Sequence, residues 1–409
     1  MELSLIYFLR RFIRDKQKHV AVQFDAHHWP GLQPLEPRLL LSGSGFVDTE
    51  IDESLDDHVI NVSLIDTPEK LEQPFDYAGQ SVNQITGDDD ENELEGTSGN
   101  DILAGGLDDD TLNGMGGDDI LKGEEDDDVY LFGDGWGVDT VVEVADEGTD
   151  TLDFTLVTRD LDFVINGTQS VTINDDVGNS TVASNIEMLI GGQGENTLDY
   201  TSFESGITVD LEEGTIEGDL EVLGIENLKG SNYNDTITGN NQNNRIEGGL
   251  GNDTQTGGLG DDVYIFGDGW GIETIIEEAG QDSGQGFDTL DFSAVTMDLD
   301  FSIDTEGILT VADTVNSSNR VTASNVEHLI GGKGINTLDY SAYLGGDASV
   351  GLDDATGIYV DLHSGTATLF ASILGFQNVT GTVNDDTIFG NTESNALNGL
   401  DGDDFIGGF

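Results

Sequence analysis

The sequence predicts an all-β protein in which short parallel β-rolls alternate with β-rich segments of a duplicated unit. Three observations support this fold class. A nine-residue period of glycine and aspartate appears in three separate blocks, and a longer unit that includes the first two blocks occurs twice. Between the blocks, β-favouring and polar residues alternate with little helical period. A nine-residue repeat buries too little apolar surface to fold alone, so we expect successive repeats to stack.

The first 45 residues differ from the rest of the chain. They hold six of its 13 basic residues, and apolar residues recur at three- and four-residue steps between Leu3 and Ile13, which is consistent with a short amphipathic helix. The apolar residues precede the basic ones, which is the wrong order for a secretory signal peptide. Residues 46–84 are acidic and lack a sustained period, so we interpret them as a linker.

The nine-residue period starts at Gly87 and continues through five consecutive repeats. It returns in four repeats from Gly230 and in three from Gly381. The three predicted rolls lie at residues 85–137, 230–271 and 381–409. Gly408 and Phe409 begin another repeat, which indicates that the third roll is truncated and that this sequence is a fragment of a longer protein.

A larger duplication includes the first two blocks. Residues 127–143, DDVYLFGDGWGVDTVVE, match residues 261–277, DDVYIFGDGWGIETIIE, and the similarity continues beyond them. The β-rich segments that complete the unit are predicted at residues 138–229 and 272–380. We interpret Trp136 and Trp270 in the matching stretches as aromatic plugs at the ends of the rolls, with a sugar-stacking surface as the alternative.

The composition of the repeat points to metal chemistry. In GGLGDDVYI the glycines permit a tight turn, so carbonyl oxygens converge beside the aspartate at the sixth position. Calcium accepts about six to eight oxygen ligands in a loose cage, whereas magnesium demands near-octahedral geometry and retains water. The next three residues form a brief strand whose middle side chain, such as Leu103 or Ile246, points into the core. Two repeats make one coil, and each ion is expected between turns one coil apart.

The repeats resemble the RTX (repeat-in-toxin, haemolysin-type) calcium-binding repeats, whose consensus is GGxGxDxUx. The resemblance implies metal ligands at the sixth position of each repeat. The implied ligands are Asp101, Asp110, Asp119, Asp128, Asp235, Asp253, Asp262, Asp386 and Asp404, with Asn244 and Asn395 where asparagine replaces aspartate. Pairing each repeat with the next but one gives roughly six calcium ions. The resemblance weakens at Glu124 and Asp126, which displace glycines, and at Gln255, which occupies the apolar position.

Two further resemblances concern location. The segment LEPRLLLS at the amino-terminal end is similar to a motif of large surface or secreted proteins of Gram-negative bacteria. Membership of the RTX family implies export by a type I system, and hence an extracellular or cell-surface location. A cell-surface or matrix ligand is a possible partner, and the sequence does not identify one.

Charge and missing motifs exclude several function classes. The formal charge is -69, from 82 acidic and 13 basic residues, which argues against nucleic acid as a partner. No apolar stretch approaches the ~18 residues of a membrane helix. The chain has no cysteine, so disulfides and thiolate zinc sites are excluded. The GxSxG, HExxH and P-loop motifs do not occur, and we therefore expect no enzyme activity.

Two functions remain open. In the first, calcium-stabilised rolls are structural or adhesin-like modules that fold on export. In the second, the chain is the spacer region of an exported RTX toxin or hydrolase whose catalytic domain lies outside this fragment.

Overall fold

The computed structural model describes eight stretches of the chain, residues 47–48, 63–64, 82–145, 148–167, 170–216, 220–277, 286–344 and 356–408. The regular structure of these residues is entirely β-strand, so the prediction of an all-β fold is confirmed. The chain divides into two compact units, residues 1–72 and 73–409. The predicted amino-terminal helix and the LEPRLLLS segment lie outside the described residues.

The first unit contributes one antiparallel pair, β1 (Val47–Asp48) with β2 (Ser63–Leu64), inside the predicted linker. The described part of the second unit contains four sheets. From one edge to the other, the 14-stranded sheet contains β3 (Asn83–Thr86), β5 (Asp101–Gly106), β7 (Ile120–Glu124), β9 (Val138–Val141), β13 (Ser180–Ser184), β12 (Ser170–Asn174), β11 (Leu161–Ile165), β15 (Asn196–Asp199), β18 (Asn227–Lys229), β20 (Arg245–Glu247), β22 (Val263–Ile265), β24 (Thr289–Asp291), β28 (His328–Ile330) and β32 (Ser372–Leu374).

The other three sheets are shorter, and their strands also follow one another in space. The ten-stranded sheet contains β16 (Thr208–Asp210), β19 (Thr236–Thr238), β21 (Thr254–Thr256), β23 (Ile272–Ile275), β27 (Arg320–Ala323), β26 (Leu309–Asp313), β25 (Leu299–Ile303), β29 (Asn336–Asp339), β33 (Asn378–Thr380) and β35 (Ala396–Asn398). The six-stranded sheet contains β17 (Glu221–Leu223), β14 (Met188–Ile190), β10 (Thr151–Leu156), β8 (Val129–Gly133), β6 (Thr111–Asn113) and β4 (Glu93–Glu95). The four-stranded sheet contains β31 (Thr366–Ala367), β30 (Tyr359–Asp361), β34 (Thr387–Phe389) and β36 (Phe405–Gly407).

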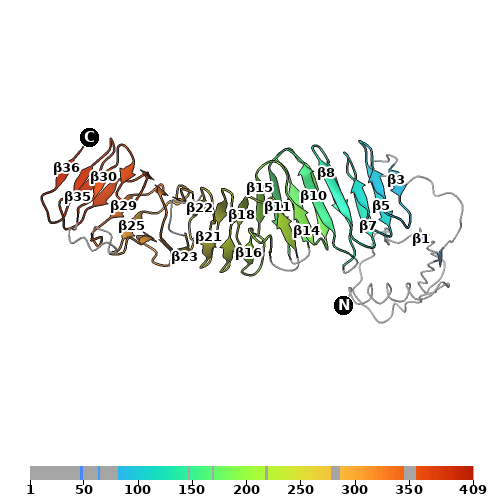
Figure 1. The fold of residues 1–409 in the computed structure, drawn as a ribbon, viewed down its shortest axis with the longest axis horizontal. Helices are drawn as coiled ribbons and strands as arrows, with labels where there is room; N and C mark the ends of the chain where they lie inside the picture. Colours follow the sequence, from blue (N-terminus) through green and yellow to red (C-terminus); the bar gives the residue numbers. More distant parts are fainter. Residues whose placement is uncertain are drawn as a thin grey trace, which may run out of the picture. The chain divides into compact units, whose positions relative to one another are not determined.

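The nine-residue period sets the register of the rolls. Leu103 of β5 lies beside Leu121 of β7, and Leu94 of β4 lies beside Leu112 of β6, in both cases on parallel strands. The paired residues are two repeats, or 18 positions, apart, so two repeats form one coil as predicted. Odd and even repeats therefore contribute to different sheets, and successive coils stack side by side (Figure 1).

The sheets continue from the rolls into the β-rich segments. In the first copy of the duplicated unit, β13 pairs in parallel with β9, and β11 pairs in parallel with β15. Between these parallel contacts, β11, β12 and β13 form an antiparallel meander. The second copy repeats this arrangement with β25, β26 and β27 between β23 and β29. The segments are thus coils of the same stack with an inserted hairpin, and the predicted domain boundaries stay predictions.

The core is a column of single side chains supplied by successive repeats. Leu103, Leu112 and Leu121 are fully buried, and Tyr130 and Tyr264 occupy the same position at the ends of the first two blocks. This pattern follows from the alternation of a strand, which turns the middle side chain of each repeat inward.

The two equivalent tryptophans of the duplicated unit lie in the core. Trp136 is 1% exposed and meets Phe154 edge to face, at a ring-centroid distance of 5.6 Å. Trp270 is 2% exposed and meets Phe292 in the same way, at 5.7 Å. Rings that are buried to this degree act as plugs and leave no face for a sugar.

The described residues contain no helix of the length and apolarity that crossing a membrane requires.

Candidate metal centres

The sixth-position aspartates form rows along the edges of the rolls, in which each carboxylate accepts a hydrogen bond from the main chain of the neighbouring coil. We call such a row a ladder. Asp110 Oδ1 accepts a hydrogen bond from the main-chain N–H of Asn92 at 2.7 Å, and Asp128 Oδ1 accepts one from the N–H of Asp110 at 2.8 Å. On the other edge, Asp119 Oδ1 accepts from the N–H of Asp101 at 2.7 Å. One oxygen of each carboxylate therefore holds the neighbouring coil, 18 residues away in sequence.

The second carboxylate oxygen has no hydrogen-bond partner in five of these aspartates, although their side chains are at most 1% exposed. These oxygens are Oδ2 of Asp110, Asp119, Asp128, Asp253 and Asp262. A buried carboxylate without a counter-charge costs several kcal/mol, and a cation at the free oxygen removes that cost. The donor set therefore fits a hard cation such as calcium.

The glycine at the first position of each repeat lets the sixth-position side chain lie against the main chain. A Cβ added to Gly105 would lie 2.1 Å from Asp110 Oδ2 and 2.8 Å from the carbonyl oxygen of Gly123, one coil away. At Gly257 the corresponding point is 2.1 Å from Asp262 Oδ2. A carboxylate oxygen thus lies where the Cβ of any other residue would be, and at Gly105 a carbonyl oxygen of the adjacent coil lies close to it.

Burial also raises the pKa of aspartates in the ladders. Desolvation raises the pKa of Asp119 to about 6 and that of Asp128 to about 7. In the second roll, desolvation raises the pKa of Asp262 to about 8, and repulsion from Asp288 adds to it. Near pH 7 the carboxyl groups of Asp128 and Asp262 therefore hold a proton for much of the time unless a cation compensates the charge.

In other repeats, a residue of the same turn already forms hydrogen bonds with the sixth-position side chain. We call these closed turns. Asp235 Oδ2 accepts from the N–H of Ser231 at 2.7 Å, and its Oδ1 accepts from the Ser231 hydroxyl at 2.8 Å. Asp386 has the same two bonds from Thr382, at 2.7 and 2.9 Å. Asn244 Oδ1 accepts from the N–H of Asn240 in its own turn at 2.8 Å, and its Nδ2 donates to the carbonyl oxygen of Glu226 on the neighbouring coil at 2.8 Å. A serine, threonine or asparagine at the second position thus supplies hydrogen bonds to the sixth-position side chain from within the same turn.

The remaining predicted ligands lie at the ends of stacks or resemble Asn244. Asp101 Oδ2 accepts from the N–H and hydroxyl of Thr97, and its Oδ1 has no partner. Asn395 Nδ2 donates to the carbonyl oxygen of Gln377 at 2.9 Å. Asp404 is half-buried, and its Oδ1 accepts from the N–H of Asp386 at 3.0 Å. The assignment of all 11 residues as metal ligands stays a prediction.

The turns whose aspartate keeps an unpaired carboxylate oxygen, here called open turns, share a backbone conformation. In the repeat that begins at Gly248, the second and fourth positions have positive φ, 95° at Gly249 and 143° at Gly251. Glu124 and Asp126 occupy these positions in the repeat that begins at Gly123, with φ of 88° and 72°. That turn keeps its shape without the glycines, at a cost of roughly 1–2 kcal/mol for each residue held there.

The ladders continue beyond the last nonapeptides, which the period did not reveal. Asp139 Oδ1 accepts from the N–H of Asp119 at 2.9 Å, and Asp150 Oδ1 accepts from the N–H of Asp128 at 3.0 Å. In the second roll, Asp288 Oδ1 accepts from the N–H of Asp262 at 3.0 Å. These residues break the nine-residue phase, and their equivalent positions in the duplicated unit are the signal that could have found them.

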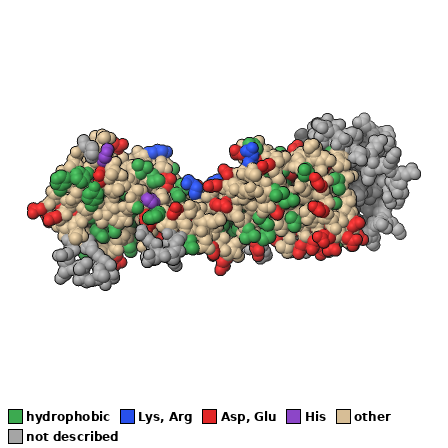
Figure 2. Space-filling view, turned by 45° about the horizontal axis from the view of Figure 1, so that its top comes forward, with side chains coloured by type: hydrophobic (Ala, Val, Ile, Leu, Met, Phe, Trp, Pro, Cys, Tyr) green, Lys and Arg blue, Asp and Glu red, His purple; other side chains and the backbone are tan. Residues whose placement is uncertain are grey.

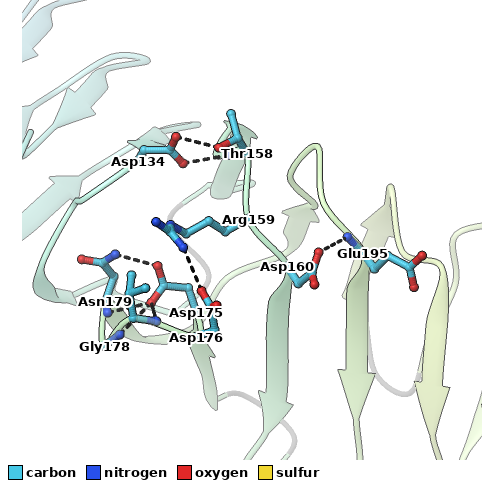
Figure 3. A network of polar contacts seen from close by, with 10 residues as sticks. Asp134, Thr158, Arg159, Asp160, Asp175, Asp176, Gly178, Asn179 and Glu195 are labelled. Carbon is cyan, nitrogen blue, oxygen red and sulfur yellow. Dashed lines mark hydrogen bonds and ion pairs between the residues drawn. The ribbon is translucent and has the colours of Figure 1, made fainter.

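Many other carboxylates of the chain are satisfied without a metal (Figure 3). Asp134 accepts from the N–H of Thr158 at 2.8 Å and from its hydroxyl at 2.7 Å, and the N–H bond is the main cause that lowers the pKa of Asp134. Arg159 pairs with Asp176 at 3.1 Å. Acidity alone therefore does not mark a site, and the unpaired buried oxygens do.

A row of exposed acids lies beside the buried ladder of the first roll. The N–H of Asp108 donates to Asp126 Oδ2 at 3.2 Å, and the N–H of Asp127 donates to Asp109 Oδ1 at 3.1 Å. Figure 2 shows acidic side chains gathered at the end of the described unit that carries this roll. Their mutual repulsion opposes stacking of the coils, and bound cations offset it.

Comparison with known proteins gives a family for the repeats. The model of the RTX calcium-binding nonapeptide repeat matches four segments, residues 77–112, 104–135, 223–255 and 380–408. No curated protein sequence matches the chain.

Among solved structures, the extracellular lipase LipA from Serratia marcescens is similar at 15% identity and a TM-score of 0.18. The alignment covers 57% of this chain and 38% of the lipase, so the chain spans well under half of that protein.

Proposed function

Because four segments of the chain match the RTX calcium-binding nonapeptide repeat, we propose that this chain is a structural, adhesin-like segment of a secreted or cell-surface protein that folds when it meets extracellular calcium. One observation carries the proposal. Five buried aspartates each keep a carboxylate oxygen without a partner, and each of these oxygens lies next to a first-position glycine. Such a fold needs cations for stability.

The energy of calcium binding is large enough for a folding switch. Extracellular calcium modules have Kd values of about 10⁻⁴ to 10⁻³ M, and a site at ~10 to 100 times Kd adds roughly 1.4 to 2.7 kcal/mol. Several such sites together equal the whole stability of a typical domain, about 5–15 kcal/mol. At cytosolic calcium these contributions disappear, which would keep the chain unfolded and suited to export.

We also propose that this chain is not an enzyme. Its buried carboxylates already accept main-chain hydrogen bonds from the neighbouring coil, as Asp128 does from Asp110. Such groups hold the coils together and coordinate ions, and we assign them no part in acid–base chemistry.

The test is circular dichroism of the full chain. In chelator we expect little β-structure, and on adding calcium a cooperative gain with a midpoint at about 10⁻⁴ to 10⁻³ M. Magnesium at the same concentration is the control, and it should restore less β-structure because it tolerates fewer protein oxygens. Identical spectra with and without calcium would contradict the proposal.

A further inference from the structure

Two buried clusters of three carboxylates lie where the first and second rolls pass into the following segments. Within each cluster, one oxygen from each residue lies within 4.8 Å of the other two. The clusters consist of Asp128, Glu143 and Asp150, and of Asp262, Glu277 and Asp288. They occupy equivalent positions in the two copies of the duplicated unit.

The position of Glu143 explains how the first cluster arises. Asp128 is the last sixth-position aspartate of its block, so no further nonapeptide turn stacks on it. Asp150, which precedes β10, takes the ladder position instead. Glu143 follows β9 by two residues, and it is 6% exposed although it lies outside the repeats. The third carboxylate is therefore brought in from the segment after the roll.

An unpaired oxygen is directed into each cluster. The N–H of Gly123 donates to Glu143 Oε1 at 3.0 Å, and a Cβ on Gly123 would lie 1.7 Å from the unpartnered Oδ2 of Asp128. Both oxygens thus lie beside the same glycine. In the second copy the N–H of Gly257 donates to Glu277 Oε1 at 3.2 Å, and a Cβ there would lie 2.1 Å from the unpartnered Oδ2 of Asp262.

Among the described residues, no basic side chain pairs with these clusters. The ion pairs in this part of the chain involve Arg159 and Lys229, and none includes a carboxylate of either cluster. Three carboxylates in a volume of this size, at exposures of 0 to 7%, repel one another strongly unless a cation lies between them.

We propose that each cluster binds one divalent cation such as calcium. This terminal site differs from the sites between nonapeptide turns because a glutamate outside the nonapeptides completes it. The inference rests on the proposed calcium-dependent function and extends it. The ion joins the last turn of the roll to the strand that follows, so it fastens the roll to the rest of the stack. All ligands are carboxylate oxygens, which suit a hard cation.

The first experiment counts ions by equilibrium dialysis of the full chain with calcium. The double variant Glu143→Gln/Glu277→Gln keeps the side-chain shape and the oxygen that accepts from glycine, and we expect it to bind two calcium ions fewer than the wild type. The matched control is Glu213→Gln/Glu306→Gln, two exposed positions, which should bind as many ions as the wild type. Equal numbers in both variants would overturn the terminal sites.

A second experiment leaves every ligand in place. The hydroxyl of Tyr264 donates to Glu277, so Tb³⁺ in the second cluster lies next to this ring and receives its excitation energy. Tyr264→Phe should lower tyrosine-sensitised Tb³⁺ emission of the full chain. Tyr340→Phe is the control, because the Tyr340 hydroxyl donates to the carbonyl oxygen of Thr368 and contacts no cluster carboxylate. Equal emission from the two variants would overturn the proposal even if the double variant folds poorly.

The two proposals fail in different ways. A wild-type chain that binds no calcium contradicts the proposed function. A wild-type chain that binds calcium, with a double variant that binds the same number of ions, contradicts only the terminal sites.

Discussion

A single neighbouring residue decides what a sixth-position aspartate does. Asp119 and Asp235 occupy the same repeat position and are both buried. Asp235 is closed by the N–H and hydroxyl of Ser231, whereas Asp119 has Met115 at the second position of its repeat and keeps Oδ2 unpaired. The consensus alone treats the two aspartates alike, and the geometry assigns them different energetic roles.

The substitution Asp119→Asn tests this difference. Asparagine keeps an oxygen for the N–H of Asp101 and removes the buried charge, so the variant should be more stable than the wild type in chelator. At saturating calcium it should lose roughly 1–3 kcal/mol of calcium-dependent stabilisation, the contribution of one site. Urea unfolding followed by circular dichroism measures both free energies.

Asp235→Asn is the matched control for that experiment. Its carboxylate accepts bonds from Ser231 and from the N–H of Ile207, so an amide there loses acceptors with or without calcium. We expect a loss of about 1–3 kcal/mol in both conditions. If both variants responded to calcium to the same extent, the division into open and closed turns would be wrong.

Part of the site could be predicted from residues and part could not. The repeat phase placed Asp110, Asp128 and Asp262 on the coil edges, where the structure has them. It could not predict Glu143 or Asp150, because these residues lie 15 and 22 positions after Asp128, out of the nine-residue phase. The fold of the segment after the repeats brings these two residues close to Asp128, and the nine-residue period does not predict that fold.

At the scale of strands, the period predicts parallel pairing but not the inserted meanders. An 18-residue offset fixes which strands of a roll are neighbours, since only that pairing keeps every apolar side chain inside. Between the rolls, β11 alternates buried and half-buried residues just as the parallel strand β5 does, so alternation does not decide the direction of the neighbouring strand. The antiparallel order of β11, β12 and β13 therefore appears only in the structure.

A first-position glycine at the end of a strand gives the test at this scale. In Gly105→Ala, the new methyl group meets Asp110 Oδ2 and the carbonyl oxygen of Gly123, so it displaces a carboxylate that is a proposed calcium ligand. We expect a loss of about 1–3 kcal/mol from overpacking and a higher calcium midpoint in the circular dichroism titration.

Gly133→Ala provides the comparison, because a Cβ at Gly133, the last residue of β8, meets nothing within 4 Å. This variant should keep the wild-type calcium midpoint, with a stability change within about 1 kcal/mol. A shift of the midpoint as large as that of Gly105→Ala would show that the effect comes from alanine in a strand and not from displacement of the Asp110 carboxylate.

At the scale of the whole molecule, the carboxylates set how stability depends on pH. Unfolded aspartate has a pKa of 3.8, whereas burial raises the pKa of Asp128 to about 7 and that of Asp262 to about 8 in the folded chain. Between these values the folded chain holds protons that the unfolded chain has released. Without calcium, the stability that Asp128 and Asp262 contribute is therefore fully present below about pH 4 and is lost as the pH rises through 7 to 8.

Calcium should reverse this slope. Because its ligands must be ionised, calcium binds more tightly as the pH rises, and the stability it adds increases over the same range. Urea midpoints measured from pH 4 to 8 should therefore fall with pH in chelator and rise with pH at saturating calcium. The measurements belong in high salt, which screens repulsion among exposed acids but not among buried ones. In chelator, the urea midpoint of Asp262→Asn should decrease less with pH than that of the wild type, because the variant lacks one of the titrating groups. Parallel slopes in chelator and calcium would mean that the buried carboxylates are not the groups that calcium neutralises.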